Sequence, residues 1–117
     1  MSSATAEVLL SQREVLNSRK IVIDMESYVF FPSEITVDHG EPLTLILNNQ
    51  SFLVPHNFLL DDPQGVRVLE ADISSGESQT FTLTLTEPGI YSFYCEKQLF
   101  FFPSHREEGM EGRLIVQ

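Results

Sequence analysis

The sequence contains only one cysteine, Cys95, among its 117 residues. A single thiol cannot form an internal disulfide, so cysteine usage does not indicate the redox compartment of the protein. Although 42% of the residues are apolar, no apolar run approaches the roughly 20 residues that a membrane-spanning helix needs. Residues 1–20 lack both a basic leader and a continuous apolar stretch, so we expect no signal peptide there.

Basic residues are also scarce. The chain has 7 Lys and Arg against 17 Asp and Glu, which gives a formal net charge of −10. This balance argues against nucleic acid and anionic membranes as partners, because neither would be neutralised. It favours a partner with a cationic surface, attracted less strongly as the salt concentration rises. Solubility alone is the alternative explanation of the charge.

The length and texture of the chain predict one domain preceded by a short arm. A chain of 117 residues is long enough for one two-layer core and too short for two. In residues 3–17 the apolar positions recur near a helical period without Gly or Pro, which predicts a short helix. We therefore expect an N-terminal helical arm over residues 1–19 and a single domain over residues 20–117.

From residue 20 onward, short β-type runs alternate with turn residues. The clearest alternation is in 80–85, where Phe81, Leu83 and Leu85 face one way and threonines the other. The strand-like runs are 21–24, 28–31, 35–37, 43–47, 56–60, 66–70, 80–85, 90–95 and 113–116. Roughly seven or eight strands with frequent turns predict an all-β fold, either an antiparallel β-sandwich or a Greek-key barrel.

The single thiol begins a stretch that is rich in potential metal ligands. Cys95 is followed by His105 and then by Met110, which together offer a thiolate, an imidazole and a thioether. A second imidazole would complete a trigonal His₂Cys site with a weak axial Met, an arrangement that selects copper for electron transfer. We expect His56 to supply that imidazole. The alternative for Cys95 is a buried, inert thiol.

Three motifs occur in order along the chain: Pro55-His56-Asn57, Gly89-Ile-Tyr-Ser-Phe-Tyr-Cys95, and His105 followed by Met110. In this combination the sequence resembles the cupredoxins, or blue copper proteins, of the plastocyanin-like kind. The resemblance covers nearly all of the chain from residue 20 onward. It implies a Greek-key β-sandwich that binds one copper ion at one end and shuttles one electron between Cu(II) and Cu(I) without transforming a substrate.

Position by position, the resemblance implies that His56, Cys95 and His105 are the equatorial copper ligands and that Met110 is the axial one. It also implies that Asn57 ties the two ligand loops together by hydrogen bonds, which would hold the ligand geometry. An extracytoplasmic location, in a periplasm or on the outer side of a membrane, is implied by the resemblance alone.

The stretch between Cys95 and His105 is longer than is usual in the family. It contains the apolar run Phe100, Phe101 and Phe102, which either folds back over the core or forms an exposed docking patch near the metal. Redox encounters use small, transient interfaces. Such a patch, ringed by Glu96, Glu107 and Glu108, would suit a cationic redox partner such as a cytochrome.

Two other functions stay open at this point. The long loop could leave an open coordination position, which would make the protein a copper enzyme or a small-molecule sensor. A carboxylate from Glu107 or Glu108 in place of the methionine would give such a harder site. The other possibility is an interaction module that kept the sandwich and binds no metal, against which stands the presence of all four ligand types in order.

Overall fold

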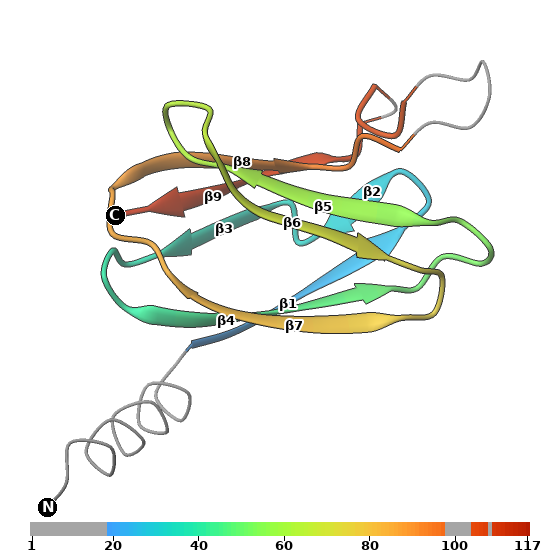
Figure 1. The fold of residues 1–117 in the computed structure, drawn as a ribbon, viewed down its shortest axis with the longest axis horizontal. Coiled ribbons are helices and arrows are strands. Elements are labelled where there is room, and N and C mark those ends of the chain that lie inside the picture. The colour runs from blue at the N-terminus through green and yellow to red at the C-terminus, as the bar shows by residue number, and fades with distance from the viewer. Residues whose placement is uncertain (1–18, 98–103, 108) are drawn as a thin grey trace, which may run out of the picture.

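The computed structural model describes residues 19–97, 104–107 and 109–117 of the chain (Figure 1). Two predictions fall outside this part: the N-terminal helix at 3–17, and the course of the apolar run 100–102. Among the described residues, no helix has the length and apolar character needed to cross a membrane.

Within the described residues, nine strands form two sheets that pack face to face (Figure 1). They are β1 (Arg19–Glu26), β2 (Val29–Phe31), β3 (Glu34–Val37), β4 (Pro42–Asn49), β5 (His56–Asp61), β6 (Arg67–Ile73), β7 (Ser78–Thr84), β8 (Gly89–Tyr94) and β9 (Glu111–Val116). The predicted all-β sandwich is confirmed, and every predicted strand overlaps an observed one. All nine strand-like runs of the sequence form separate strands, so the structure has slightly more strands than the seven or eight expected.

One sheet has the strand order β2-β1-β4-β7 and the other has the order β3-β9-β8-β5-β6. Most neighbouring strands are antiparallel, but β1 lies parallel to β4 and β3 lies parallel to β9. Parallel neighbours need a crossover connection. Here the chain leaves the first sheet after β2, contributes β3 to the second sheet, and returns as β4. These crossings give the sandwich its Greek-key character.

The core lies between the two sheets and is filled by alternate residues of each strand. On the neighbouring strands β1 and β4, the buried side chains are Ile21, Ile23, Met25, Leu43, Leu45 and Leu47. The predicted alternation on β7 is confirmed, since Phe81 and Leu83 pack against the core while the intervening threonines are exposed. Hydrophobic burial on both inner faces therefore fixes which side of each strand faces inward.

Three aromatic rings join the sheets next to one end of the sandwich. The ring centroids of Phe30 and Phe93 are 5.3 Å apart, and those of Phe58 and Phe93 are also 5.3 Å apart. Such pairs add about 0.5–1.5 kcal/mol each beyond the burial of their area. Phe58 lies two residues after His56, and Phe93 lies two residues before Cys95. The rings therefore occupy the same strand faces as these two residues and form the layer beside them.

Candidate metal centre

Four predicted ligands come from three separate segments that end at one end of the sandwich (Figure 1). His56 is the first residue of β5, and Cys95 directly follows β8. His105 lies in a turn, and Met110 directly precedes β9. Because β5, β8 and β9 belong to one sheet, with β8 between the other two, their backbone hydrogen bonds hold these segments in register.

The structure brings three of the predicted ligands, His56, Cys95 and His105, together in a tight triangle. The Nδ1 atoms of the two histidines are 3.1 Å apart, and Cys95 Sγ lies 3.8 Å from His56 Nδ1 and 3.4 Å from His105 Nδ1. A point equidistant from three atoms so spaced lies about 2 Å from each, close to the bonds of zinc to imidazole (about 2.0–2.1 Å) and to thiolate (about 2.3 Å) in proteins. The triangle therefore fits a metal ion at its centre.

All three side chains are buried. Burial, together with the neighbouring His105, lowers the pKa of His56 to about 4, so this imidazole is neutral at physiological pH. Burial also raises the pKa of the Cys95 thiol. A neutral imidazole already has the form that binds a metal, whereas the thiol must lose its proton, which a cation between the three atoms would favour.

Met110 is buried and lies close to the triangle along the backbone. Its amide nitrogen donates to the carbonyl oxygen of His105 over 2.9 Å, and its carbonyl oxygen accepts from the amide of Cys95 over 3.2 Å. These bonds fasten Met110 to two residues of the triangle. Its role as the axial ligand remains a prediction.

Asn57 makes the hydrogen bonds that the family resemblance implied. Its backbone nitrogen donates to Cys95 Sγ over 3.3 Å, and its side-chain Oδ1 accepts from the amide of Glu96 over 2.9 Å. One residue thus fastens the start of β5 to the segment after β8, at the cysteine and at the residue that follows it. An amide hydrogen bond to sulfur also favours the thiolate over the thiol.

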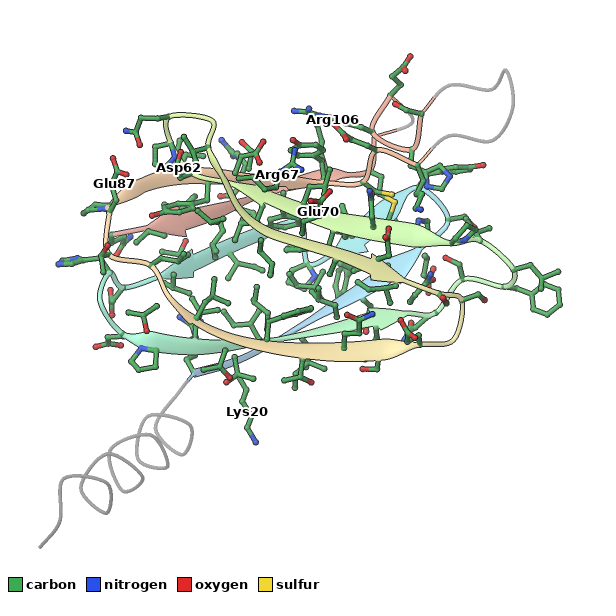
Figure 2. All side chains as sticks on the ribbon, viewed as in Figure 1. Lys20, Asp62, Arg67, Glu70, Glu87 and Arg106 are labelled. Carbon is green, nitrogen blue, oxygen red and sulfur yellow. The ribbon has the colours of Figure 1, made fainter. Side chains whose placement is uncertain are left out.

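The turn that carries His105 is anchored on Tyr94, the residue before the cysteine. The guanidinium of Arg106 lies 4.0 Å from the centroid of the Tyr94 ring. The Tyr94 hydroxyl donates to Asp61 over 2.6 Å and accepts from Arg67 over 3.1 Å, and both arginines lie over the same sheet (Figure 2). The hydrogen bond to Asp61 and, to a smaller extent, burial of the ring raise the pKa of Tyr94. Cation–π contact and hydrogen bonds therefore hold the two ligand segments together.

Sequence reasoning missed Ser51, whose hydroxyl oxygen lies 2.8 Å from His56 Nε2. Ser51 is buried in the loop between β4 and β5, and its amide donates to the side chain of Asn49 over 3.0 Å. No role was predicted for the polar residues 48–51. Their position just before a predicted histidine ligand was the available signal, because such histidines usually bond a second group through the other ring nitrogen.

Tyr28 was also missed. It lies in the turn between β1 and β2 with a φ of 66°, and its ring meets the His105 ring edge-on at a centroid distance of 5.0 Å. The sequence predicted only that residue 28 begins a strand. His105 is only 1% exposed and Tyr28 is 39% exposed, so a partly exposed tyrosine ring packs against this buried imidazole.

Comparison with known proteins agrees with the fold. The family model for the cupredoxin-like domain matches residues 1–116. The chain is 37% identical to plastocyanin of Daucus carota over 103 residues, covering 83% of this chain and 96% of that protein. It is 33% identical to the chloroplastic plastocyanin minor isoform of Arabidopsis thaliana over 123 residues, covering 98% of this chain and 66% of that protein.

A solved structure shows the same fold. Reduced auracyanin from the photosynthetic bacterium Roseiflexus castenholzii superposes with a TM-score of 0.72 at 22% identity, covering 86% of this chain and 98% of that one. The chain belongs to the cupredoxin family of blue copper electron-transfer proteins. Within this family its relatives include plastocyanins.

Proposed function

We propose that the protein carries single electrons at a copper ion held by Nδ1 of His56, Nδ1 of His105 and Sγ of Cys95, with Met110 as the axial ligand. The observation that supports this most directly is the buried triangle of soft and borderline donors, with sides of 3.1, 3.4 and 3.8 Å. Copper bound there supplies the Cu(II)/Cu(I) couple, for which His₂Cys ligation with a weak axial thioether is suited.

The residues around the triangle serve to keep it rigid. His56 is bonded through Nε2 to Ser51, and Cys95 Sγ accepts from the amide of Asn57. The backbone of Met110 is bonded to both His105 and Cys95. A site fixed in this way changes little between oxidation states, so little rearrangement opposes the transfer of an electron. The thiol of Cys95 gives up its proton to solvent when the metal is loaded.

We also propose that the protein transforms no substrate. His56 and Cys95 are fully buried, and His105 has the ring of Tyr28 against it. A substrate would need an open position at the metal, and the burial of all three donors opposes such a position. The rival reading as a copper enzyme or sensor predicts instead that small anions reach the metal.

The proposed electron partner docks at the end of the sandwich that carries the triangle. Phe52 is 86% exposed and Leu53 is 76% exposed, and both follow Ser51, which touches His56. Tyr28, which touches His105, is a third exposed side chain beside the donors, and we call these three residues the apolar rim. The predicted contribution of residues 100–102 to this docking surface lies outside the described residues and remains part of the proposal.

The charges near this rim favour a partner with basic groups. Exposed carboxylates adjoin the segments that carry the rim and the donors: Glu26, Glu96 and Glu107. An apolar contact surrounded by carboxylates is complementary to a redox protein with a basic surface, such as a cytochrome. A small patch of this kind gives the weak, short-lived contact that electron transfer uses.

Two further parts of the proposal are the location of the protein in the cell and the division of the chain into an N-terminal arm and a domain. An extracytoplasmic location is supported by membership of the family, one of whose members related to this chain is named as chloroplastic. The division into an arm over residues 1–19 and a domain over residues 20–117 is supported by the start of β1 at Arg19.

A Cu(II) titration followed by visible absorption and EPR tests the proposal. The expected result is an intense thiolate-to-copper band in the red and a narrow copper hyperfine splitting at one equivalent of copper. The Cys95→Ser variant is the control and should bind copper without the band. A weak band with an ordinary copper hyperfine splitting in the wild-type protein would contradict the proposal and favour a copper enzyme or sensor instead.

A further inference from the structure

The contact between Ser51 and His56 joins a hydroxyl, which can both donate and accept a hydrogen bond, to the imidazole of a predicted metal ligand. Ser51 Oγ lies 2.8 Å from His56 Nε2, and both side chains are buried. We propose that Ser51 is a positioning residue for the metal centre: its hydroxyl accepts the Nε2 proton of His56 when Nδ1 binds the metal, and donates to Nε2 when Nδ1 holds the proton. The proposal rests on the ligand assignment given above.

The first step is to count protons between the two histidines. His56 Nδ1 and His105 Nδ1 are 3.1 Å apart, which is a hydrogen-bond distance. A bond between two ring nitrogens needs one proton, so without metal one of these two Nδ1 atoms carries it. A metal needs the lone pairs of both. Loading the site therefore requires that His56 carry its single proton on Nε2, opposite Ser51.

The second step concerns the kind of group that meets Nε2. A carbonyl or a carboxylate can only accept a hydrogen bond, and it would face a lone pair whenever the proton of His56 lay on Nδ1. A hydroxyl can both donate and accept, because its proton rotates about the Cβ–Oγ bond. Ser51 therefore satisfies Nε2 in both protonation patterns while every heavy atom stays in place. The imidazole of His56 neither gains nor loses a proton on loading, and the proton released comes from Cys95.

The third step is that Ser51 itself is held from several sides. Its amide donates to Asn49 Oδ1 over 3.0 Å, and its carbonyl accepts from the hydroxyl of Ser75. Asn49 is buried, and its Nδ2 donates to the carbonyls of Val54 and Ile73 over 2.9 Å each. The hydroxyl thus sits at a fixed place on a braced loop. With Ser51 only 6% exposed, water has little access to replace it.

Three variants separate the hydroxyl from the brace. Ser51→Ala removes the hydroxyl, Ser51→Thr keeps it, and Ser75→Ala removes one brace while leaving the Ser51 hydroxyl in place. Affinity is measured with Zn(II) and with Cu(I) by competition against chelators. We expect Ser51→Ala to weaken binding by about 10–100-fold, the usual cost of removing a group that orients a metal-bound histidine. Ser51→Thr should restore most of that loss, and Ser75→Ala should have the smaller effect.

Long-range ¹H–¹⁵N NMR of the Zn(II)-loaded protein gives a readout that a merely structural role would not move. In the wild type, Nε2 of His56 should be protonated and its proton protected from exchange, whereas in Ser51→Ala that proton should exchange faster. Unchanged affinity and exchange in Ser51→Ala would overturn the inference, as would coordination of His56 through Nε2. If Ser51→Thr fails to fold, the comparison of affinity and Nε2 proton exchange between the wild type and Ser51→Ala decides. A wild type that gives no red thiolate band with Cu(II) would instead refute the ligand assignment, so the two failures are distinguishable.

Discussion

The Nδ1 atoms of His56 and His105 lie 3.1 Å apart although the two residues are separated by 49 positions in the sequence. Both rings are buried and both direct the same nitrogen toward Cys95 Sγ. Two protonated rings could not share this arrangement, because like charges so close together in a buried place repel strongly. The pair is thus arranged to be neutral and to receive a cation.

Variants of the equatorial ligands and of the axial ligand should have different effects on the copper centre. His56→Ala and Cys95→Ser should each abolish the intense visible band, because each removes an equatorial donor. Met110→Leu should keep copper bound with a changed reduction potential, because an axial thioether contact is long and weak. Absorption spectra and protein-film voltammetry measure both effects. Retention of the band in Cys95→Ser would contradict the assignment.

The metal-free protein should lose stability as the pH falls from about 6.5 to about 4. The pKa of His56 is lowered to about 4 in the folded protein by burial and by His105, while an exposed histidine titrates near 6.5. Between these values the unfolded chain binds a proton that the folded chain does not, so protonation favours unfolding. The loss should be on the order of 3 kcal/mol. Urea denaturation at several pH values measures it, and His56→Gln should show a shallower dependence.

Removing the ring of Tyr28 should expose the centre to anions. The Tyr28 ring meets the His105 ring at 5.0 Å, so Tyr28→Ala should allow azide to shift the spectrum of the copper-loaded protein. Tyr28→Phe keeps the ring and is the matched control, which should behave like the wild type. If azide perturbs the wild type and the alanine variant equally, then Tyr28 does not shield the metal.

The apolar rim should govern the rate of electron transfer. Phe52→Ser and Leu53→Ser should slow the reaction with a basic cytochrome in stopped-flow measurements, since both side chains are exposed beside the donors. Val66→Ser is a suitable control, because Val66 is 60% exposed but lies in the turn between β5 and β6, at the other end of β5 from His56. The rate should also fall as salt rises, as expected for a chain of net charge −10. Equal slowing by all three variants would argue against a docking surface at the rim.

Gly112 should not tolerate a side chain. A Cβ on this residue would lie against the ring of Phe93 and the carbonyl oxygen of Ser33, and neither the packed ring nor the backbone can easily move. Gly112→Ala should therefore destabilise the protein by about 1–3 kcal/mol, as overpacked sites do. Gly76→Ala is the comparison, because nothing lies within 4 Å of its Cβ and only its φ of 75° opposes the change. Thermal unfolding should show the larger loss for Gly112→Ala.

The main elements of the site were predictable because chemistry and order along the chain constrained them. A lone cysteine with a following histidine and methionine leaves few alternatives for a soft metal site, and the motif around His56 supplied the second imidazole. The long stretch between Cys95 and His105 did not prevent the histidine from reaching the triangle. The bonds of Asn57 followed from the same resemblance, since they are made largely by backbone groups next to the ligands.

Other features depend on loop conformation that local patterns do not encode. Tyr28 reaches His105 because its backbone adopts a positive φ, which is uncommon for a residue other than glycine. Ser51 reaches His56 only because Asn49 holds the loop. The parallel pairs β1–β4 and β3–β9 arise from partners far apart in the chain, whereas alternation of apolar residues reports the face of a strand and not its neighbours.

The position of β9 has a consequence for how the protein matures. Of the nine strands in the described residues it follows all the others in sequence, yet it lies inside its sheet between β3 and β8. Pairing between β9 and β3 is slow, because the two strands are far apart in sequence. His105 and Met110 lie shortly before β9. We therefore expect the donors to meet only after β9 has been synthesised. We also expect that a chain in which β9 has not yet paired binds copper weakly, so that metal loading follows the completion of the sheet.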